Sequence, residues 1–160
     1  MEAYEVTQVM LSVGTVYQVR RPRQEEVLYT VKGELMSPTP KFHLTEGDEK
    51  GKERAQLLGN FIKTKYEIQV DGKSAATLVF PAVAFKKTLT LVVGEEEFEA
   101  DGGVFKGVFQ CKKKDGSLAI EIAKQLSLRD TFSVQVAEGM PFEVGLLAAV
   151  AIHSRFYEMV

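Results

Sequence analysis

The feature that most constrains the fold is an apolar run near the C-terminus, because the rest of the chain alternates between apolar and polar residues. Seven consecutive residues, Leu146–Ile152, are apolar. In a helix they would cover every direction around the axis, whereas a surface helix keeps a polar face. Pro141 stands where a first helical turn tolerates proline, and the three alanines of the run favour a helix. The run predicts a helix buried all round, with a central strand of a β-sandwich as the alternative.

Alternation with a period of two dominates the remaining sequence, for example in Lys65–Val70, Thr88–Val93 and Thr131–Val136. This pattern is typical of strands with one buried and one hydrated face, as in antiparallel sheets. Asp71-Gly72 and Asp115-Gly116 are two-residue hairpin signals. Runs bounded by turns recur at roughly 8–12 residues, which favours a barrel or a sandwich over alternating strands and helices.

The runs predict about twelve strands. They span residues 3–10, 14–20, 26–35, 41–45, 54–61, 65–70, 73–80, 86–93, 96–101, 105–112, 117–126 and 130–136. Closure into a barrel removes exposed sheet edges and leaves an interior for the apolar helix. We therefore expect a mainly β fold, an antiparallel barrel of about twelve strands that encloses a hydrophobic C-terminal helix. The 160 residues are expected to form one domain, residues 1–160.

Composition and motifs argue against several functions. The formal net charge of −2 argues against nonspecific nucleic-acid binding, which needs a basic excess. The sequence contains no phosphate-binding glycine motif and no nucleophile elbow. Its two histidines, His43 and His153, lie in different predicted elements, and His153 is expected to cap the C-terminal end of the helix or to lie at the barrel mouth. We expect no metal, no cofactor and no enzymatic activity, because the helix would also fill the interior.

The lone cysteine, Cys111, allows no internal disulfide, and a reducing cytoplasm is the simplest compartment. This residue is expected to be a small buried wall residue rather than a reactive thiol. No secretory signal is visible, and the longest apolar run is well short of the about 20 residues that span a membrane. A cytoplasmic chain without a transmembrane span is expected, either free or peripheral to a membrane.

Two basic clusters are the candidate ligand sites. They are the arginine cluster, Arg20, Arg21 and Arg23, and the lysine cluster, Lys112, Lys113 and Lys114. A third basic pair, Lys86-Lys87, opens another predicted strand. Converging Lys and Arg side chains attract anionic lipid headgroups, each contributing about 1 kcal/mol near a charged membrane. The alternative is a set of solvated turns balanced by Glu25, Glu26 and Asp115.

Several segments resemble the tubby C-terminal-like fold, which is shared by tubby proteins, phospholipid scramblases and the LURP-one-related family. Lys32–Ser37 resembles an early strand with its glycine. Ile120–Lys124, followed by Arg129–Val134, is similar to a later strand pair, and Leu146–Ile152 resembles the closing helix. The resemblance implies a barrel wrapped around a helix along nearly the whole chain.

The resemblance also implies a function. Tubby domains bind phosphoinositides through basic residues on the barrel exterior, so a noncatalytic module for anionic phospholipid is one expectation. For this function the two basic clusters should lie together on one face with few acids between them. The alternative is a protein-interaction or scaffold domain of LURP-one-related type that binds no lipid.

Removal of the C-terminal helix is expected to abolish folding. The helix side chains expected to be almost fully buried are Val144, Leu146, Leu147, Val150 and Ile152. A chain truncated after Met140 would leave a hollow barrel, and Leu147→Asp would bury an unpaired charge at a cost of several kcal/mol. Urea unfolding followed by circular dichroism tests both variants, and a truncated chain that unfolds cooperatively would contradict the central-helix arrangement.

Overall fold

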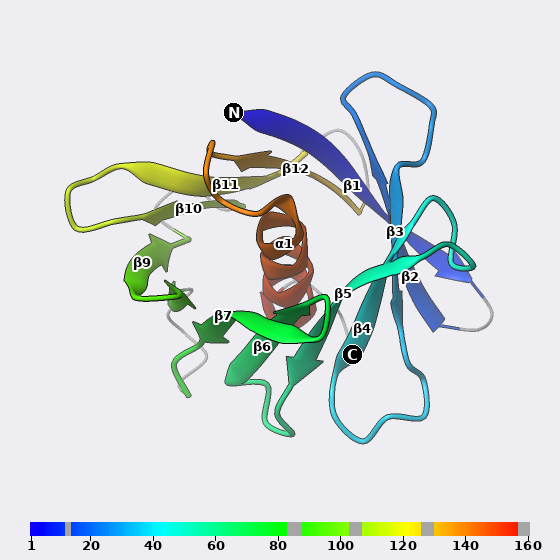
Figure 1. The fold of residues 1–160 in the computed structure, drawn as a ribbon, viewed down its shortest axis with the longest axis horizontal. Helices are drawn as coiled ribbons and strands as arrows, with labels where there is room; N and C mark the ends of the chain where they lie inside the picture. The colour runs from blue at the N-terminus through cyan, green and yellow to red at the C-terminus, as the bar shows by residue number, and fades with distance from the viewer. Residues whose placement is uncertain (12–13, 83–87, 103–106, 126–129, 157–160) are drawn as a thin grey trace.

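A computed structural model describes residues 1–11, 14–82, 88–102, 107–125 and 130–156. Within these residues, twelve antiparallel strands form a closed barrel around one helix (Figure 1). Every strand pairs with its neighbours in sequence, and the barrel closes where the first strand pairs with the last. The predicted fold, a mainly β barrel that encloses the C-terminal helix, is confirmed.

The strand boundaries follow the predicted ranges closely. The elements are β1 (Glu2–Leu11), β2 (Gly14–Arg20), β3 (Tyr29–Gly33), β4 (Lys41–Glu46), β5 (Glu53–Gly59), β6 (Lys65–Val70), β7 (Lys73–Val79), β8 (Thr88–Val93), β9 (Glu96–Asp101), β10 (Val108–Lys112), β11 (Leu118–Lys124), β12 (Thr131–Val136) and α1 (Phe142–Phe156). The third strand is shorter than the predicted 26–35, because β2 pairs with β3 only from Tyr29 onward. No helix in the described part of the chain is long and apolar enough to cross a membrane.

The helix α1 fills the barrel. Its residues are buried from Glu143 to Ser154, which covers every side of the helix. The predicted burial is confirmed, because the exposed fraction is 0% for Val144, Leu146, Leu147 and Val150 and 1% for Ile152. The inward-facing side chains of the strands, such as Leu57 on β5 and Ile68 on β6, form one hydrophobic core with α1.

Because the strands run up and down in sequence order, the loops of the barrel divide between its two ends. Consecutive antiparallel strands place their connections at alternate ends, so the loops after β2, β4, β6, β8 and β10 share one end. The helix begins at this end, which we call the helix-entry end. The loops after β3 and β5 lie at the opposite end, which we call the helix-exit end.

The start of α1 is held by an arginine. Arg54 of β5 donates to Glu46 at 2.6 Å and to the buried Glu143 of the first helical turn at 3.4 Å. Its guanidinium lies 5.3 Å from the ring centre of Phe142, and the ring of Tyr29 stacks on Phe142 at 5.0 Å. A carboxylate in the first turn also suits the positive end of the helix dipole. These contacts fix how the helix enters the barrel.

His153 lies deeper than the sequence predicted. The predicted place at the C-terminal end of the helix is confirmed, because His153 lies in the last turn of α1, but the side chain is only 5% exposed and so does not lie at an open mouth. Its Nδ1 lies 3.0 Å from the hydroxyl of Tyr17, and its ring stacks on Phe132 at 5.4 Å. Tyr17 on β2 and Phe132 on β12 therefore hold the last turns of the helix from the wall.

Gly145→Ala is expected to lower the free energy of unfolding by about 1–3 kcal/mol, because overpacking a closed interior forces neighbours to shift. A Cβ at Gly145 would lie 2.4 Å from Cγ2 of Val136. Val136→Ala removes the overlapping methyl groups, so the double variant should lose less stability than the sum of the two single variants. Urea unfolding measures the coupling, and strictly additive losses would contradict close packing here.

Candidate functional site

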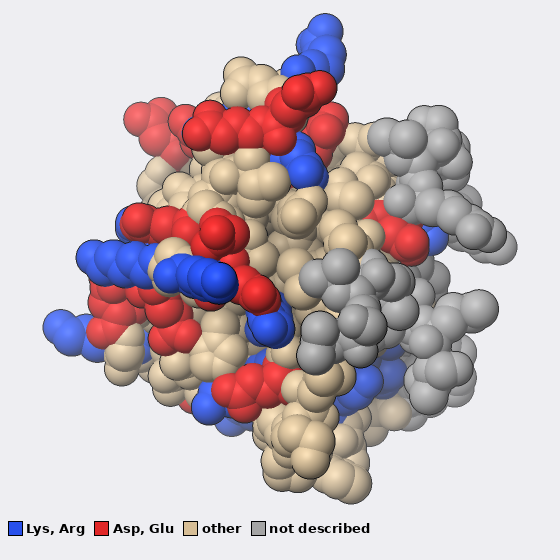
Figure 2. Space-filling view, turned by 90° about the vertical axis from the view of Figure 1, so that its right-hand side faces the viewer, with Lys and Arg blue, Asp and Glu red and all other residues tan. Residues whose placement is uncertain are grey.

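The arginine cluster lies at the end of β2 and in the loop that follows it. Arg20 secures this loop, since its Nε donates to the carbonyl of Glu25 at 3.1 Å and its Nη2 to Gln18 at 2.8 Å. Arg23 is exposed at the turn, with a φ of 61°, and its side chain has no ion pair or hydrogen bond among the described residues. Acidic side chains sit directly beside basic ones on the loop at the top of the face in Figure 2.

Arg21 is bound to the start of β1. Its Nη1 lies 2.5 Å from Glu2 Oε2 and donates to the carbonyl of Ala3 at 3.2 Å. The guanidinium also stands 4.5 Å from the ring centre of Tyr4, a cation–π distance. Arg21 therefore ties β2 to β1 and has less freedom to contact a headgroup than Arg23.

The lysine cluster lies at the β10–β11 hairpin among glutamates. Lys113 Nζ is 3.0 Å from Glu96 Oε1, and Lys112 stands opposite Glu99 in the strand register. Lys112 and Lys114 are exposed and line a shallow hollow of about 270 Å³ together with Glu97 and Glu99. The positive charge of this cluster is therefore balanced locally.

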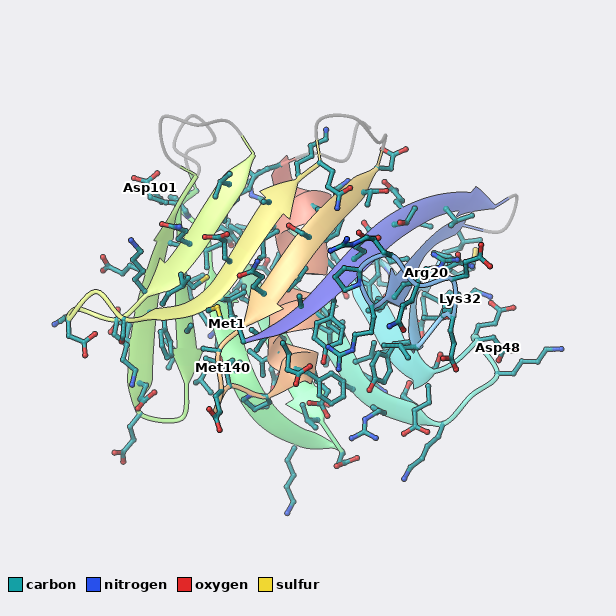
Figure 3. The ribbon with its side chains drawn as sticks, turned by 90° about the horizontal axis from the view of Figure 1, so that it is seen from above. Met1, Arg20, Lys32, Asp48, Asp101 and Met140 are labelled. Atoms are coloured by element: carbon teal, nitrogen blue, oxygen red, sulfur yellow. The ribbon has the colours of Figure 1, made fainter. Side chains whose placement is uncertain are left out.

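The two clusters share an end of the barrel but do not form one patch. Both lie in loops at the helix-entry end, and β1 and β12 separate β2 from β11. In Figure 1 the β10–β11 hairpin projects at the left and the loop after β2 at the upper right, and Figure 3 likewise places Arg20 far from that hairpin. The expected convergence on one face with few acids between does not occur, so the lipid hypothesis loses the support that the two clusters together would have given it. Lys86 and Lys87 lie outside the described residues.

A third polar cluster was not singled out from the sequence. His43 of β4 lies between two carboxylates: its Nε2 is 2.6 Å from Glu34 Oε1, and its Nδ1 bonds Glu53 Oε1. The hydrogen bond from His43 holds the pKa of Glu34 below its usual range, and Lys41 adds an ion pair at 3.8 Å. His43 lies on the outer face of β4, between the buried Phe42 and Leu44, but the register that supplies its partners is not visible in the sequence.

Open grooves of several hundred Å³ lie on the outer surface of the barrel. One open groove of about 630 Å³ runs beside His43, Met36 and Glu49, and another of about 730 Å³ lies over β8, β9 and β10. Within the described part of the barrel interior, the hollow beside His153 measures only about 10 Å³. The arrangement can bind ligands at its surface and leaves little space inside.

Cys111, the one cysteine of the sequence, lies inside the barrel. Cys111 is fully buried, which confirms the predicted wall position, and burial raises the pKa of its thiol to about 12. Its thiolate form is therefore scarce at neutral pH. Among the described residues, no three His, Cys, Asp or Glu side chains are grouped so that they could hold a metal ion.

A closed twelve-stranded barrel around a C-terminal helix is the tubby C-terminal-like architecture that the sequence resembled. The chain belongs to the LURP-one-related family, whose model matches residues 2–153. It is similar to a protein of Arabidopsis thaliana known from an X-ray structure, with a TM-score of 0.61 over 94% of this chain and 88% of that chain. At 10% sequence identity this likeness shows the fold alone. A comparison with curated proteins finds no match.

Arg21→Ala is expected to lower the melting temperature by about 2–6 °C, because it removes the ion pair with Glu2 and the contact with Tyr4, together worth about 1–2 kcal/mol. Arg23→Ala is the matched control and should leave the melting temperature unchanged, since its side chain is exposed. Thermal unfolding followed by circular dichroism compares the two, and equal melting temperatures would show that Arg21 is not structural.

Proposed function

We propose that this LURP-one-related domain is a noncatalytic binding module that recognises an anionic phospholipid surface from the outside of its barrel. The observation that carries the proposal is the occupied interior. The helix α1 is buried from Glu143 to Ser154, so the space in which many barrels hold a small ligand is filled by the chain itself. Recognition is therefore assigned to loops and outer strand faces.

Exposed cationic side chains support a lipid ligand. Arg23 at the helix-entry end and Lys65 at the helix-exit end are exposed and have no ion pair among the described residues. Each such cation contributes about 1 kcal/mol near an anionic membrane, and this contribution falls as salt screens it. The resemblance to tubby domains, which bind phosphoinositides, points the same way. Because the net charge is −2, any attraction must be local to one part of the surface.

A protein partner is the second candidate, and a different observation favours it. The groove of about 630 Å³ is lined by the apolar Met36, which is 95% exposed, and by charged side chains that include Glu49 and Lys32, an ion pair at 2.8 Å. An apolar patch rimmed by charge is typical of a surface that contacts another protein. This arrangement fits a partner segment with apolar and polar side chains.

Vesicle co-sedimentation tests the lipid function. The chain is expected to sediment with vesicles that contain phosphatidylserine or phosphoinositide more than with neutral phosphatidylcholine vesicles. This difference should shrink between low and high salt, because the attraction is electrostatic. Equal sedimentation with neutral and anionic vesicles at every salt concentration would reject the lipid function and leave the protein-partner function.

A further inference from the structure

Two loops at the helix-exit end expose large apolar side chains to solvent. The loop after β3, residues 34–40, and the loop after β5, residues 60–64, carry them. The exposed fractions are 62% for Leu35, 95% for Met36, 79% for Phe61 and 67% for Ile62. Single exposed apolar residues are ordinary on a protein surface, whereas large ones gathered on adjacent loops mark a contact site.

The two loops form one structural unit. The backbone N–H of Gly59 donates to the carbonyl of Pro40 at 2.7 Å, which links the base of one loop to the base of the other. In Figure 1 they project side by side at the lower edge of the barrel, and the same lower edge is a largely uncharged protrusion in Figure 2. We call the four side chains Leu35, Met36, Phe61 and Ile62 the docking edge.

Hydrogen bonds within the β5–β6 loop engage the polar groups on both sides of its apolar tip. Asn60 Oδ1 accepts from the N–H of Thr64 at 2.8 Å and of Lys65 at 3.0 Å, and its Nδ2 donates to Thr64 Oγ1 at 2.9 Å. The carbonyl of Asn60 accepts from the N–H of Lys63 at 3.1 Å. Phe61 and Ile62 therefore occupy the centre of a turn that Asn60 holds in place, and the groups bonded in this way have less need of water near an apolar medium.

The charges around the docking edge are positive or balanced. Lys63 and Lys65 follow the apolar tip directly, and neither has an ion pair among the described residues. No acidic residue occurs from Asn60 to Tyr66. The acid of the other loop, Glu34, is engaged by Lys41 and His43. An apolar tip with free lysines behind it complements an anionic bilayer surface.

We propose that the docking edge inserts Phe61, Ile62 and Met36 into the interfacial layer of an anionic membrane, while Lys63 and Lys65 contact headgroup phosphates. Projecting loop tips suit a bilayer, which deforms around them, better than a protein partner, which needs about 1,200–2,000 Å² of matched surface. The inference rests on the proposed lipid function. It assigns the contact to the helix-exit end, opposite the arginine and lysine clusters.

The absence of tryptophan from the sequence allows a direct test. Phe61→Trp places a single reporter on the docking edge, and Lys114→Trp places a matched control at the helix-entry end. With vesicles of phosphatidylcholine and phosphatidylserine, the emission of Phe61→Trp should shift to the blue and be quenched by brominated lipid. The emission of Lys114→Trp should do neither.

Three other outcomes distinguish a failure of the docking edge from a failure of the lipid function. If the chain sediments with anionic vesicles but only Lys114→Trp responds, the docking edge is wrong and the lipid function survives. If no variant responds although the unaltered chain sediments with anionic vesicles, the docking edge is also wrong. If the unaltered chain does not sediment with anionic vesicles, the lipid function and the docking edge both fail.

A loss-of-binding variant adds a second readout. Phe61→Ser with Ile62→Ser should weaken partitioning into anionic vesicles by about tenfold or more, because two large apolar side chains no longer enter the bilayer. Lys112→Ala with Lys114→Ala should weaken it less. The melting temperature of both variants should equal that of the unaltered chain, since the replaced side chains are exposed. Unchanged partitioning of the serine variant would overturn the proposal and make a protein the next occupant to test.

Discussion

The burial of α1 inside the barrel is the interaction on which the rest of the structure depends. A ring of twelve strands encloses more volume than its own inward side chains fill, and the helix supplies the missing apolar groups. Each fully buried leucine, such as Leu146 or Leu147, contributes about 1.5–3 kcal/mol. The alanines and Gly145 keep the helix thin enough to fit. Because the helix takes up the interior, any recognition of a ligand is left to the exterior.

The same residue types serve different purposes at the two ends of the barrel. At the helix-entry end, Arg54 holds Glu143 of the helix, and Arg21 lies on Tyr4 and pairs with Glu2. A cation engaged in this way must give up a native contact before it binds a headgroup. At the helix-exit end, Lys63 and Lys65 have no ion pair among the described residues and need break none to bind a headgroup. Lys112 and Lys114 at the entry end also lack an ion pair but lie among Glu97 and Glu99, whereas residues 60–66 at the exit end include no acid. The electrostatic argument for membrane contact is therefore stronger at the exit end.

Local signals explain why most of the fold could be predicted from the sequence. Period-two alternation identified the strands, and the apolar run Leu146–Ile152 identified the helix, because both patterns lie within one element. The site depends on pairing between elements. Lys113 meets Glu96 and His43 meets Glu34 only through strand register, and the two basic clusters are kept apart by the strands that close the barrel. A single sequence contains no local signal for these distances.

The side chain of Asn60 determines that Phe61 lies at the surface and not in the barrel wall. The alternation predicted a strand over residues 54–61, which would include Phe61, but β5 ends at Gly59. The carboxamide of Asn60 accepts from the backbone N–H groups of Thr64 and Lys65, and this side-chain turn replaces further strand pairing. Phe61 and Ile62 are thereby moved from the wall to the tip of a loop. Because Asn60 itself organises this turn, a polar pair at its centre would serve folding equally well, so the apolar pair is better explained by a contact outside the chain.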